Sequence, residues 1–175
     1  LLDVDGDKDL DLLELNDLEQ NRLYRNDGKG VFTDVTASSL PAEKRSSWDG
    51  EAADVDGDGD LDLVVVKWGP GANGQNRLYR NDGKGRFTDA TKGGLPARSD
   101  RTFTVALGDL DGDGDPDLVL GQAGNNEILL NDGKGRFSSS AAATLPVDPQ
   151  TASDILLADL DEDGDLDMIV ANLNT

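Results

Sequence analysis

The 175-residue chain has no cysteine and no histidine, and these two absences exclude several kinds of site. Zinc and copper sites are built largely from Cys and His ligands, so we expect neither metal here. Histidine is also the commonest general acid or base and cysteine a strong nucleophile, so the most familiar catalytic groups are missing. Without cysteine, disulfide bonds cannot reveal the compartment in which the protein works.

Positive charge is scarce, since 16 Lys and Arg residues face 36 Asp and Glu residues and leave a net charge of −20. Nucleic acids and anionic membrane surfaces are bound through clustered Lys and Arg, so we expect neither as a partner. No apolar run approaches the roughly 20 residues of a membrane-spanning helix, and no signal peptide is visible. The sequence opens on Leu1 instead of Met, which suggests a piece of a longer protein.

Aspartate is abundant, and it occupies every second position of a nine-residue run four times over. The runs contain Asp3, Asp5, Asp7, Asp9 and Asp11; Asp54, Asp56, Asp58, Asp60 and Asp62; Asp109, Asp111, Asp113, Asp115 and Asp117; and Asp159, Asp161, Asp163, Asp165 and Asp167. Carboxylates this close repel one another, so each run needs a cation. Ca²⁺ takes six to eight hard oxygens in flexible geometry, whereas Mg²⁺ prefers fewer protein ligands. The sequence therefore predicts up to four Ca²⁺ ions, one per run, which would reduce the net charge to about −12.

The nine positions of each run have different expected roles. Side chains at positions 1, 3, 5 and 9 can point at a central cation, and position 7 offers its backbone carbonyl. That carbonyl would come from Asp9, Asp60, Asp115 and Asp165. Position 6 needs a sharp turn at positive φ, which Gly59, Gly114 and Gly164 allow and Lys8 in the first run resists. We therefore expect the first site to be the weakest.

Two other interpretations of the runs are weaker. An EF-hand needs a bidentate Glu at position 12 of its loop and flanking helices. Position 12 is Glu14, Val65, Leu120 or Val170 in the four runs, and strand-like segments flank them. The remaining interpretation, acidic surface turns without metal, is disfavoured by the regular i, i+2 spacing of carboxylates in four copies.

The Asp runs belong to a repeat with a period of 50 to 55 residues, because they begin at residues 3, 54, 109 and 159. A second motif, Asn-Arg-Leu-Tyr-Arg-Asn-Asp-Gly-Lys-Gly, occupies 21–30 and 76–85, with a looser copy at 126–135. Leu-Pro pairs at 40–41, 95–96 and 145–146 give a third marker. Three markers with one period predict a repeat architecture, with units at 1–40, 41–95 and 96–145 and an incomplete unit at 146–175.

Each unit is predicted to hold four short strands. The first strands (48–53, 103–108, 155–158) lead into the Asp runs and the second (61–68, 118–121, 166–171) leave them. Their Val, Ile and Leu content is typical of strands packed on both faces. The third and fourth strands of each unit flank Asp-Gly pairs at 27–28, 82–83 and 132–133, where we expect type I′ turns. The glycine two residues later is expected to lengthen the turn or to form a β-bulge. This pattern predicts an all-β fold, a β-propeller fragment of about three and a half four-stranded blades, with a β-sandwich as the alternative.

These motifs carry a resemblance to a known family. Residues 109–121, Asp-Leu-Asp-Gly-Asp-Gly-Asp-Pro-Asp-Leu-Val-Leu-Gly, resemble the FG-GAP repeats of integrin α-subunit propellers. The Asn-Arg-Leu-Tyr-Arg-Asn-Asp-Gly segment is similar to the related VCBS-type repeats of large secreted bacterial proteins. The resemblance covers essentially the whole chain. It implies that each Asp loop joins the first two strands of a blade and binds Ca²⁺, and that the complete propeller has about seven blades.

The functional expectation is a binding module without catalytic activity, since no His or Cys is present and the paired carboxylates are occupied as ligands. Such a module would be secreted or exposed on a cell surface and would bind a protein or a carbohydrate, or mediate adhesion. Calcium loops of this kind usually need extracellular calcium, so the expected location is extracellular, at the cell surface or periplasmic. The alternatives are the non-catalytic half of a Ca²⁺-dependent, propeller-type polysaccharide lyase and a purely structural spacer.

The candidate contacts with a ligand are few. Trp68, followed by an irregular insertion at 69–75 that occurs only in the second unit, is the best candidate. Trp48 is expected in the core. Arg22, Arg25, Arg77 and Arg80 alternate with Tyr24 and Tyr79, and we expect them to pair with neighbouring Asp residues and to pack between blades; stacking on a sugar is the alternative. Open blade faces would be covered by the remaining blades of the parent chain or by a second copy.

Overall fold

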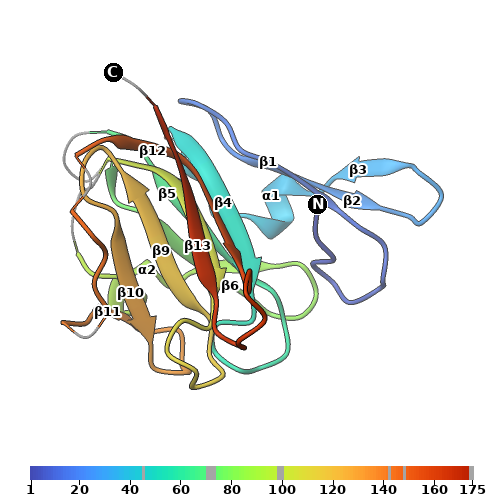
Figure 1. The fold of residues 1–175 in the computed structure, drawn as a ribbon. Helices are drawn as coiled ribbons and strands as arrows, with labels where there is room; N and C mark the ends of the chain where they lie inside the picture. Colours follow the sequence, from blue (N-terminus) through green and yellow to red (C-terminus); the bar gives the residue numbers. More distant parts are fainter. Residues whose placement is uncertain (45, 70–73, 98–100, 142, 148, 174–175) are drawn as a thin grey trace.

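The computed structural model describes residues 1–44, 46–69, 74–97, 101–141, 143–147 and 149–173. Apart from two single helical turns, the regular structure of these residues is β-strand, arranged in consecutive antiparallel sheets (Figure 1). Within the same residues, no helix is long and apolar enough to cross a membrane. The fold is all-β and consists of propeller-like blades, as the sequence predicts.

Each sheet follows the order of the chain. The first contains β1 (Leu12–Glu14), β2 (Arg22–Asn26) and β3 (Phe32–Asp34); the second contains β4 (Ser47–Ala53), β5 (Asp62–Lys67), β6 (Arg77–Asn81) and β7 (Phe87–Asp89). The third contains β8 (Thr102–Gly108), β9 (Asp117–Gln122), β10 (Glu127–Asn131) and β11 (Phe137–Ser139), and the fourth contains β12 (Thr151–Ala158) and β13 (Asp167–Leu173). The helical turns α1 (Thr36–Ser39) and α2 (Thr91–Gly94) follow β3 and β7.

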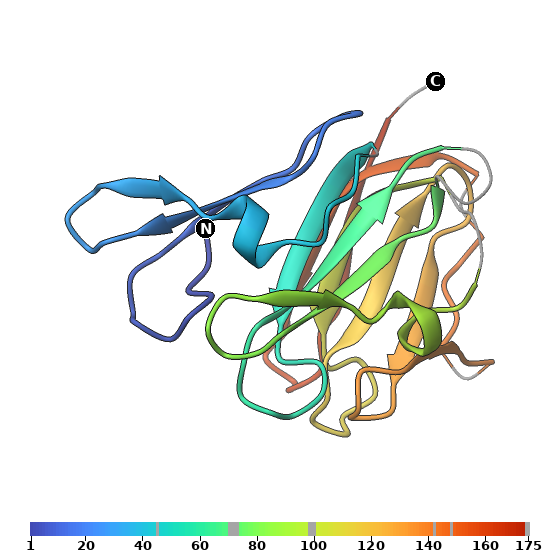
Figure 2. The ribbon, with the colours of Figure 1, turned by 180° about the vertical axis from the view of Figure 1, so that it is seen from behind.

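The core lies between adjacent sheets. The apolar runs predicted as second strands pack on both faces, and every residue of β5 is buried. Val64, Val105 and Leu120 belong to the cluster between the second and third sheets, and Leu23 and Leu63 to the cluster between the first and second. The inner strands β4, β8 and β12 lie side by side. Seen from either side, the first sheet projects away from the other three (Figures 1 and 2).

The hairpins after β2, β6 and β10 form where the Asp-Gly pairs predict them, but the turn type is different. Only the glycines have positive φ, +70° at Gly28 and +85° at Gly30 in the first hairpin, so the predicted type I′ turn is wrong at Asp27. The Asp27 carboxylate instead accepts hydrogen bonds from the backbone N–H groups of Lys29 and Val31. The side chain thus organises a longer turn, in which the second glycine extends the connection.

Each of the three inner strands contains a β-bulge near its beginning. The pairing register shifts between Ser47 and Asp49 in β4, and at the equivalent places in β8 and β12, so that Trp48, Phe103 and Ser153 are the bulged residues. A bulge re-aims its side chain out of the regular alternation. The expectation that Trp48 belongs to the core is therefore wrong, because its side chain is 52% exposed.

Candidate metal centres

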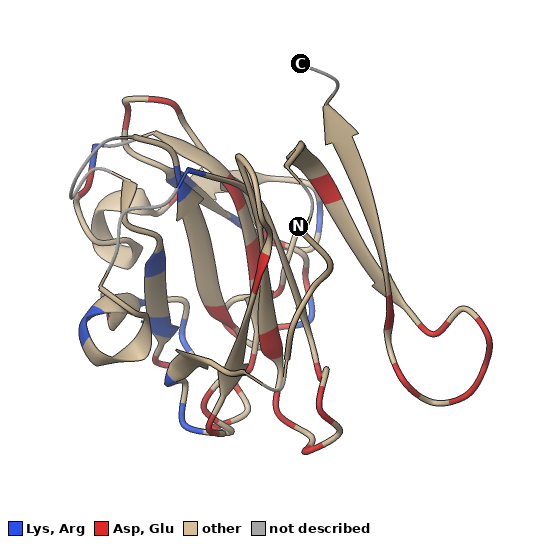
Figure 3. Cartoon of the chain, turned by 60° about the vertical axis from the view of Figure 1, so that its left-hand side comes forward, with Lys and Arg blue, Asp and Glu red and all other residues tan. Residues whose placement is uncertain are grey.

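The four Asp runs form loops at one end of the sheets, where many of the acidic residues of the chain lie (Figure 3). In each loop, three carboxylates offer oxygens that all lie within 4.8 Å of one another. The clusters are Asp3, Asp5 and Asp11; Asp54, Asp56 and Asp58; Asp109, Asp111 and Asp117; and Asp159, Asp161 and Asp167. Positions 1 and 3 take part in every cluster, joined by position 9 in three loops and by position 5 in the second.

The first Asp of each loop holds the loop in its curved shape. Asp109 accepts hydrogen bonds from the N–H groups of Gly112 (2.8 Å) and Gly114 (2.9 Å), one on each carboxylate oxygen. Asp54 accepts equivalent bonds from Gly57 and Gly59. These bonds wrap the backbone around the carboxylate cluster, as a short side chain at the start of a turn does.

The last Asp of each of the first three loops ties the loop to the hairpin of its own unit. Asp117 is fully buried; its Oδ2 accepts the N–H of Leu110 (3.0 Å) and its Oδ1 accepts the N–H of Asn131 at the end of β10 (2.8 Å). Asp11 and Asp62 accept the equivalent N–H groups of Asn26 and Asn81. Position 9 is therefore both a candidate ligand and a fixed structural link.

The side chain at position 7 points to the hairpin instead. The Asp60 carboxylate lies so close to Gly83 that a Cβ at Gly83 would be 2.5 Å from Asp60 Oδ2. Asp9 and Asp115 approach Gly28 and Gly133 in the same way. The predicted use of the backbone carbonyl at this position stays a prediction. The contact also explains why the Asp-Gly pair recurs, since this glycine needs both positive φ and the absence of a side chain.

Two positions in every loop have positive φ, and two of these eight positions are not glycine. Lys8 occupies position 6 of the first loop at φ +74°, and Glu162 occupies position 4 of the fourth loop at φ +63°. Gly57 and Gly112 fill position 4 in the second and third loops. The left-handed region costs an L-residue about 1–2 kcal/mol, so the first loop is strained as the sequence suggests, and the fourth loop shares this strain.

Replacing Lys8 by glycine should therefore stabilise the chain by about 0.5–1 kcal/mol, after the larger unfolded-state entropy of glycine is subtracted. Lys29→Gly is the matched control, because Lys29 is an exposed lysine of the same unit without positive φ. Urea unfolding in saturating Ca²⁺ would measure both changes. Equal effects of the two substitutions would contradict the strain at Lys8.

The first and second loops are also clamped by the hairpin of the following unit. Asn131 Nδ2 donates to the carbonyl of Val55 in the second loop (2.9 Å), and Asn81 Nδ2 donates to the carbonyl of Val4 in the first loop (2.8 Å). Arg80 pairs with Asp56 of its own unit (2.5 Å) and donates to the carbonyl of Lys134 in the next hairpin.

Arg25 does the same with Asp5 and Lys84. The predicted pairing with Asp is therefore confirmed for Arg25 and Arg80, and Arg22 lies 4.0 Å from Asp34. It is wrong for Arg77, which pairs with Glu43.

Burial and mutual repulsion make several of these carboxylates resist ionisation. The pKa of Asp62 is raised to about 6, mainly by burial and also by repulsion from Asp56 and Asp58, although the hydrogen bond from the N–H of Asn81 opposes the shift. Burial is also the main reason why the pKa of Asp117 lies above its usual range. Both shifts describe loops without metal, in which the negative charge is not neutralised.

Calcium affinity should consequently weaken as the pH falls through about 6. Without metal, folded Asp62 keeps its proton up to about pH 6 while the unfolded group ionises near 3.8, so the metal-free fold loses stability as the pH rises between these values. With Asp62 as the ligand that its position 9 predicts, Ca²⁺ would displace that proton, so binding at this loop should be about tenfold weaker at pH 5 than at pH 7.

Calorimetric titration in two buffers with different heats of ionisation would measure the protons released per Ca²⁺, which should increase between pH 7 and pH 5. In Asp62→Asn the titrating group is removed while the acceptor for the Asn81 N–H remains, so the release should decrease. Affinity that stays constant between the two pH values would contradict the proton competition.

The loops pass a further test for a cation. Asp5 Oδ1 and Asp56 Oδ1, both at position 3, are buried without a hydrogen-bond partner. The other oxygen of each is held by Arg25 or Arg80. An unsatisfied buried polar atom costs free energy, and a divalent cation at the carboxylate cluster would remove that cost. An all-oxygen donor set of this kind fits Ca²⁺.

A family model described as an FG-GAP-like repeat matches the chain at residues 3–65, 54–120 and 109–170. The chain belongs to the FG-GAP-like repeat family. Each matched segment begins at the first Asp of a loop and ends in the second strand of the following unit, so this FG-GAP-like period is the period of the Asp runs. Among curated proteins, no match to the chain was found.

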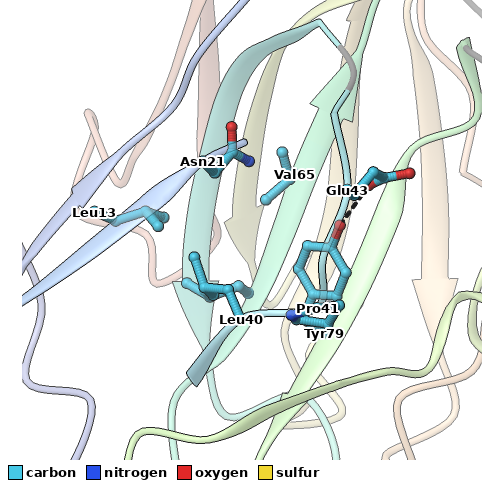
Figure 4. Close-up of a pocket in the computed structure, with 8 residues that line it drawn as sticks. Leu13, Asn21, Leu40, Pro41, Glu43, Val65 and Tyr79 are labelled. Carbon is cyan, nitrogen blue, oxygen red and sulfur yellow. Dashed lines mark hydrogen bonds between the residues drawn. The ribbon is translucent and has the colours of Figure 1, made fainter. Parts of the chain in front are cut away.

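These FG-GAP-like repeats also contain a buried polar cluster that no sequence spacing reveals. Glu43 accepts a hydrogen bond from the Tyr79 hydroxyl (2.7 Å; Figure 4). It also accepts a hydrogen bond from Arg77, and Lys67 Nζ lies 3.3 Å from its carboxylate. Buried Lys67 also donates to Ser47 Oγ (2.8 Å). Burial raises the pKa of Glu43, but the hydrogen bonds and the two cations outweigh it and leave the pKa below its usual range. The adjoining cavity of about 10 Å³ holds at most one water, so the cluster is a structural link.

An exposed aromatic patch lies at the end of the FG-GAP-like strands opposite the Asp loops. Trp48 packs edge-to-face against Trp68, with ring centroids 6.0 Å apart, and against Phe103, with centroids 5.4 Å apart. Both tryptophans of the chain are there, and Trp68 is 42% exposed. Residues 70–73 of the predicted ligand loop lie outside the described residues. The patch contains Trp68, which the sequence indicates as a ligand contact. It also contains Trp48 and Phe103, the bulged residues of β4 and β8, which the sequence does not indicate as ligand contacts.

Proposed function

We propose that the chain is a calcium-binding module that recognises a protein or carbohydrate ligand without catalysing a reaction. The observation that carries the calcium part is the set of four carboxylate clusters, two of which contain a buried oxygen with no hydrogen-bond partner. Bound calcium would neutralise the carboxylates, and the residues of the chain would hold the loop between two hairpins. The module is thereby stabilised where its repeats meet.

The aromatic patch supports the recognition part of the proposal. Trp48 of β4 and Trp68, which directly follows β5, are both exposed, and Trp48 packs against the half-buried Phe103 of β8, although aromatic residues make up only 5% of the chain. Contiguous exposed apolar surface of this kind marks binding sites. Flat indole rings offer contact area at low cost in side-chain entropy, both to sugar rings and to peptide side chains.

A secreted or surface location is part of the same proposal. The ligand oxygens are carried on exposed loops, and calcium loops in extracellular modules bind with Kd values on the order of 10⁻⁴–10⁻³ M. Such sites fill at extracellular calcium concentrations. A measured Kd in the micromolar range or below at neutral pH would contradict this part, because the sites would then also fill at lower calcium concentrations.

Binding should depend on the tryptophans. A panel of polysaccharides and extracellular proteins, presented to the intact chain in millimolar Ca²⁺, should yield a ligand whose affinity decreases at least about tenfold in Trp68→Ala. Phe32→Ala is the matched control, because Phe32 is a similarly exposed aromatic residue (44%) far from the patch.

The same panel separates the alternative functions. Release of unsaturated sugar products would favour the lyase, and the complete absence of a ligand would favour the spacer. If Trp68→Ala and Trp48→Ala leave the affinity for a ligand unchanged, the chain is a binding module, but its recognition surface is not the aromatic patch.

A further inference from the structure

A polar pocket of about 450 Å³ lies in the second unit, at the same end of the sheets as the aromatic patch. Its walls include Gln75, Arg77, Asp89, Thr91 and Lys92, which belong to the beginning of β6, the end of β7 and α2. The second sheet packs against a described sheet on each side, so the pocket is not an uncovered blade face. Small-molecule sites usually have volumes of about 300–1,000 Å³, and this pocket has that size.

The pocket offers hydrogen-bond donors and acceptors next to each other. Exposed Lys92 has three N–H donors, and exposed Asp89 uses Oδ1 to accept the N–H of Thr91 (2.9 Å), which leaves further acceptor capacity on the carboxylate. The Thr91 hydroxyl accepts the N–H of Leu78 (3.1 Å) and can still donate its own hydrogen. A sugar hydroxyl both donates and accepts, so neighbouring hydroxyls of a sugar ring match this mixture.

One segment of the chain joins the pocket to the aromatic patch. Trp68 of the patch and Gln75 of the pocket lie at the two ends of the insertion that only the second unit has. Beside them, the Lys67 N–H donates to Asn76 Oδ1 (3.0 Å), and Asn76 Nδ2 donates to Thr102 Oγ1 (3.1 Å), directly before the Phe of the patch. These hydrogen bonds hold the two surfaces next to each other.

The aromatic rings are also fixed relative to one another. Asp49, which follows Trp48, accepts hydrogen bonds from Thr104 Oγ1 (2.9 Å) and from the N–H of Val105 (3.0 Å), and Thr104 follows Phe103. The bulged residues of β4 and β8 are therefore tied together by their neighbours. A surface that is already ordered loses less entropy when it binds a flexible ligand.

We propose that the pocket and the aromatic patch together bind an uncharged oligosaccharide, with one sugar unit in the pocket and the next against the exposed indole rings. This inference rests on the proposed recognition function and assigns one class of ligand to it. Flat aromatic rings cover the apolar face of a sugar ring, and the polar groups of the pocket bind its hydroxyls.

Other ligand classes fit the pocket less well. An apolar peptide side chain would take Asp89 and Lys92 out of water without giving them hydrogen bonds. A charged side chain would meet a like charge on one of these two residues. An acidic oligosaccharide is disfavoured because the chain carries a net charge of −20. The uncharged, hydroxyl-rich ligand avoids all three costs.

An array of neutral oligosaccharides, acidic oligosaccharides and peptides, probed with the labelled intact chain in millimolar Ca²⁺, tests the ligand class. Neutral oligosaccharides of two or more units should bind. Binding to acidic oligosaccharides or peptides alone, or to no member of the array, would overturn the inference. A peptide ligand whose affinity decreases in Trp68→Ala would overturn it and still support the proposed recognition function.

Tryptophan fluorescence then tests the place of binding. Trp48 and Trp68 are the two tryptophans of the chain, so its tryptophan emission reports directly on the patch. Titration with the neutral oligosaccharide that binds best on the array should change this emission saturably. One of its sugar units alone should bind at least about tenfold more weakly. Equal affinities of the single unit and the oligosaccharide would contradict a site that spans the pocket and the patch.

Variants of the pocket complete the test. Asp89→Asn keeps an acceptor for the Thr91 N–H and removes the charge, and Lys92→Ala removes an exposed ammonium; each should weaken the oligosaccharide at least about tenfold. Lys84→Ala is the matched control, because Lys84 is an exposed lysine of the same unit in the hairpin after β6. A loss in either pocket variant that Lys84→Ala does not share supports the inference. An unchanged affinity in both pocket variants would overturn it.

Discussion

In millimolar Ca²⁺ the thermal midpoint of the intact chain should lie far above its midpoint in EGTA. A ligand that binds only the folded state contributes RT ln(1 + [L]/Kd), which is about 0.4–1.4 kcal/mol per site at the one- to tenfold excess that millimolar Ca²⁺ has over a Kd of 10⁻⁴–10⁻³ M. For a chain of this size, 1 kcal/mol corresponds to roughly 2–4 °C, so each loop should contribute about 1–6 °C, and the four loops together several times that. The physical reason is that each loop gathers five carboxylates and that the first two loops leave at least one buried carboxylate oxygen without a hydrogen-bond partner.

Magnesium at the same concentration is the control for simple charge screening. Mg²⁺ keeps its own waters and demands near-octahedral geometry, so it should restore only a minor part of the stability. Asp109→Asn removes one charge from the third cluster and should reduce the calcium-dependent part of the shift without abolishing it, because three other loops remain. Midpoints that coincide in Ca²⁺ and EGTA would contradict calcium binding, whatever the fold.

The repeat and its loops could be predicted because their chemistry is local. The i, i+2 carboxylates of a loop, for example Asp109 and Asp111, are close in space because they are close in the chain. Likewise the Asp27-Gly28 pair places a hairpin wherever the flanking segments are strand-like. The turn type was nevertheless predicted wrongly. The Asp27 carboxylate accepts hydrogen bonds from two backbone N–H groups, and this stabilises a longer turn in place of the type I′ turn that the dipeptide alone favours.

The features that sequence reasoning missed depend on residues far apart in the chain. The polar cluster around Glu43 needs Arg77 and Tyr79, more than 30 positions away. The exposure of Trp48 follows from a bulge, and no residue type marks that bulge, since its equivalents are Phe103 and Ser153. An apolar residue in a strand-like run is ordinarily a core residue, so the sequence predicts that Trp48 is buried. Only the strand register of the structure reveals the bulge that exposes it.

The joint between repeats is the most consequential of these missed features. The amide of Asn131 donates to the carbonyl of Val55, 76 positions away in the second Asp loop, and also to the carbonyl of Pro116 in its own loop (3.1 Å). Asn81 makes the equivalent pair of bonds to Val4 and Leu61. Asn81 and Asn131, each of which precedes an Asp-Gly pair, thus fasten two Asp loops to one hairpin.

Asn131→Ala should therefore destabilise the chain by about 2–4 kcal/mol, because two carbonyls lose their donor in a buried place. The backbone N–H of residue 131 remains and still serves Asp117, so the third loop keeps its own support. The loss should fall on the second loop, whose Val55 carbonyl is no longer held.

Urea unfolding in saturating Ca²⁺ would measure the stability, and calorimetry would show weaker binding at one of the sites. Asn125→Ala, which removes an exposed amide six residues earlier, should change stability by less than about 0.5 kcal/mol. If Asn131→Ala changes the stability as little as Asn125→Ala does, the asparagine bond does not join the repeats. Calcium would then stabilise each loop on its own, and the loops would have no energetic link to the next blade.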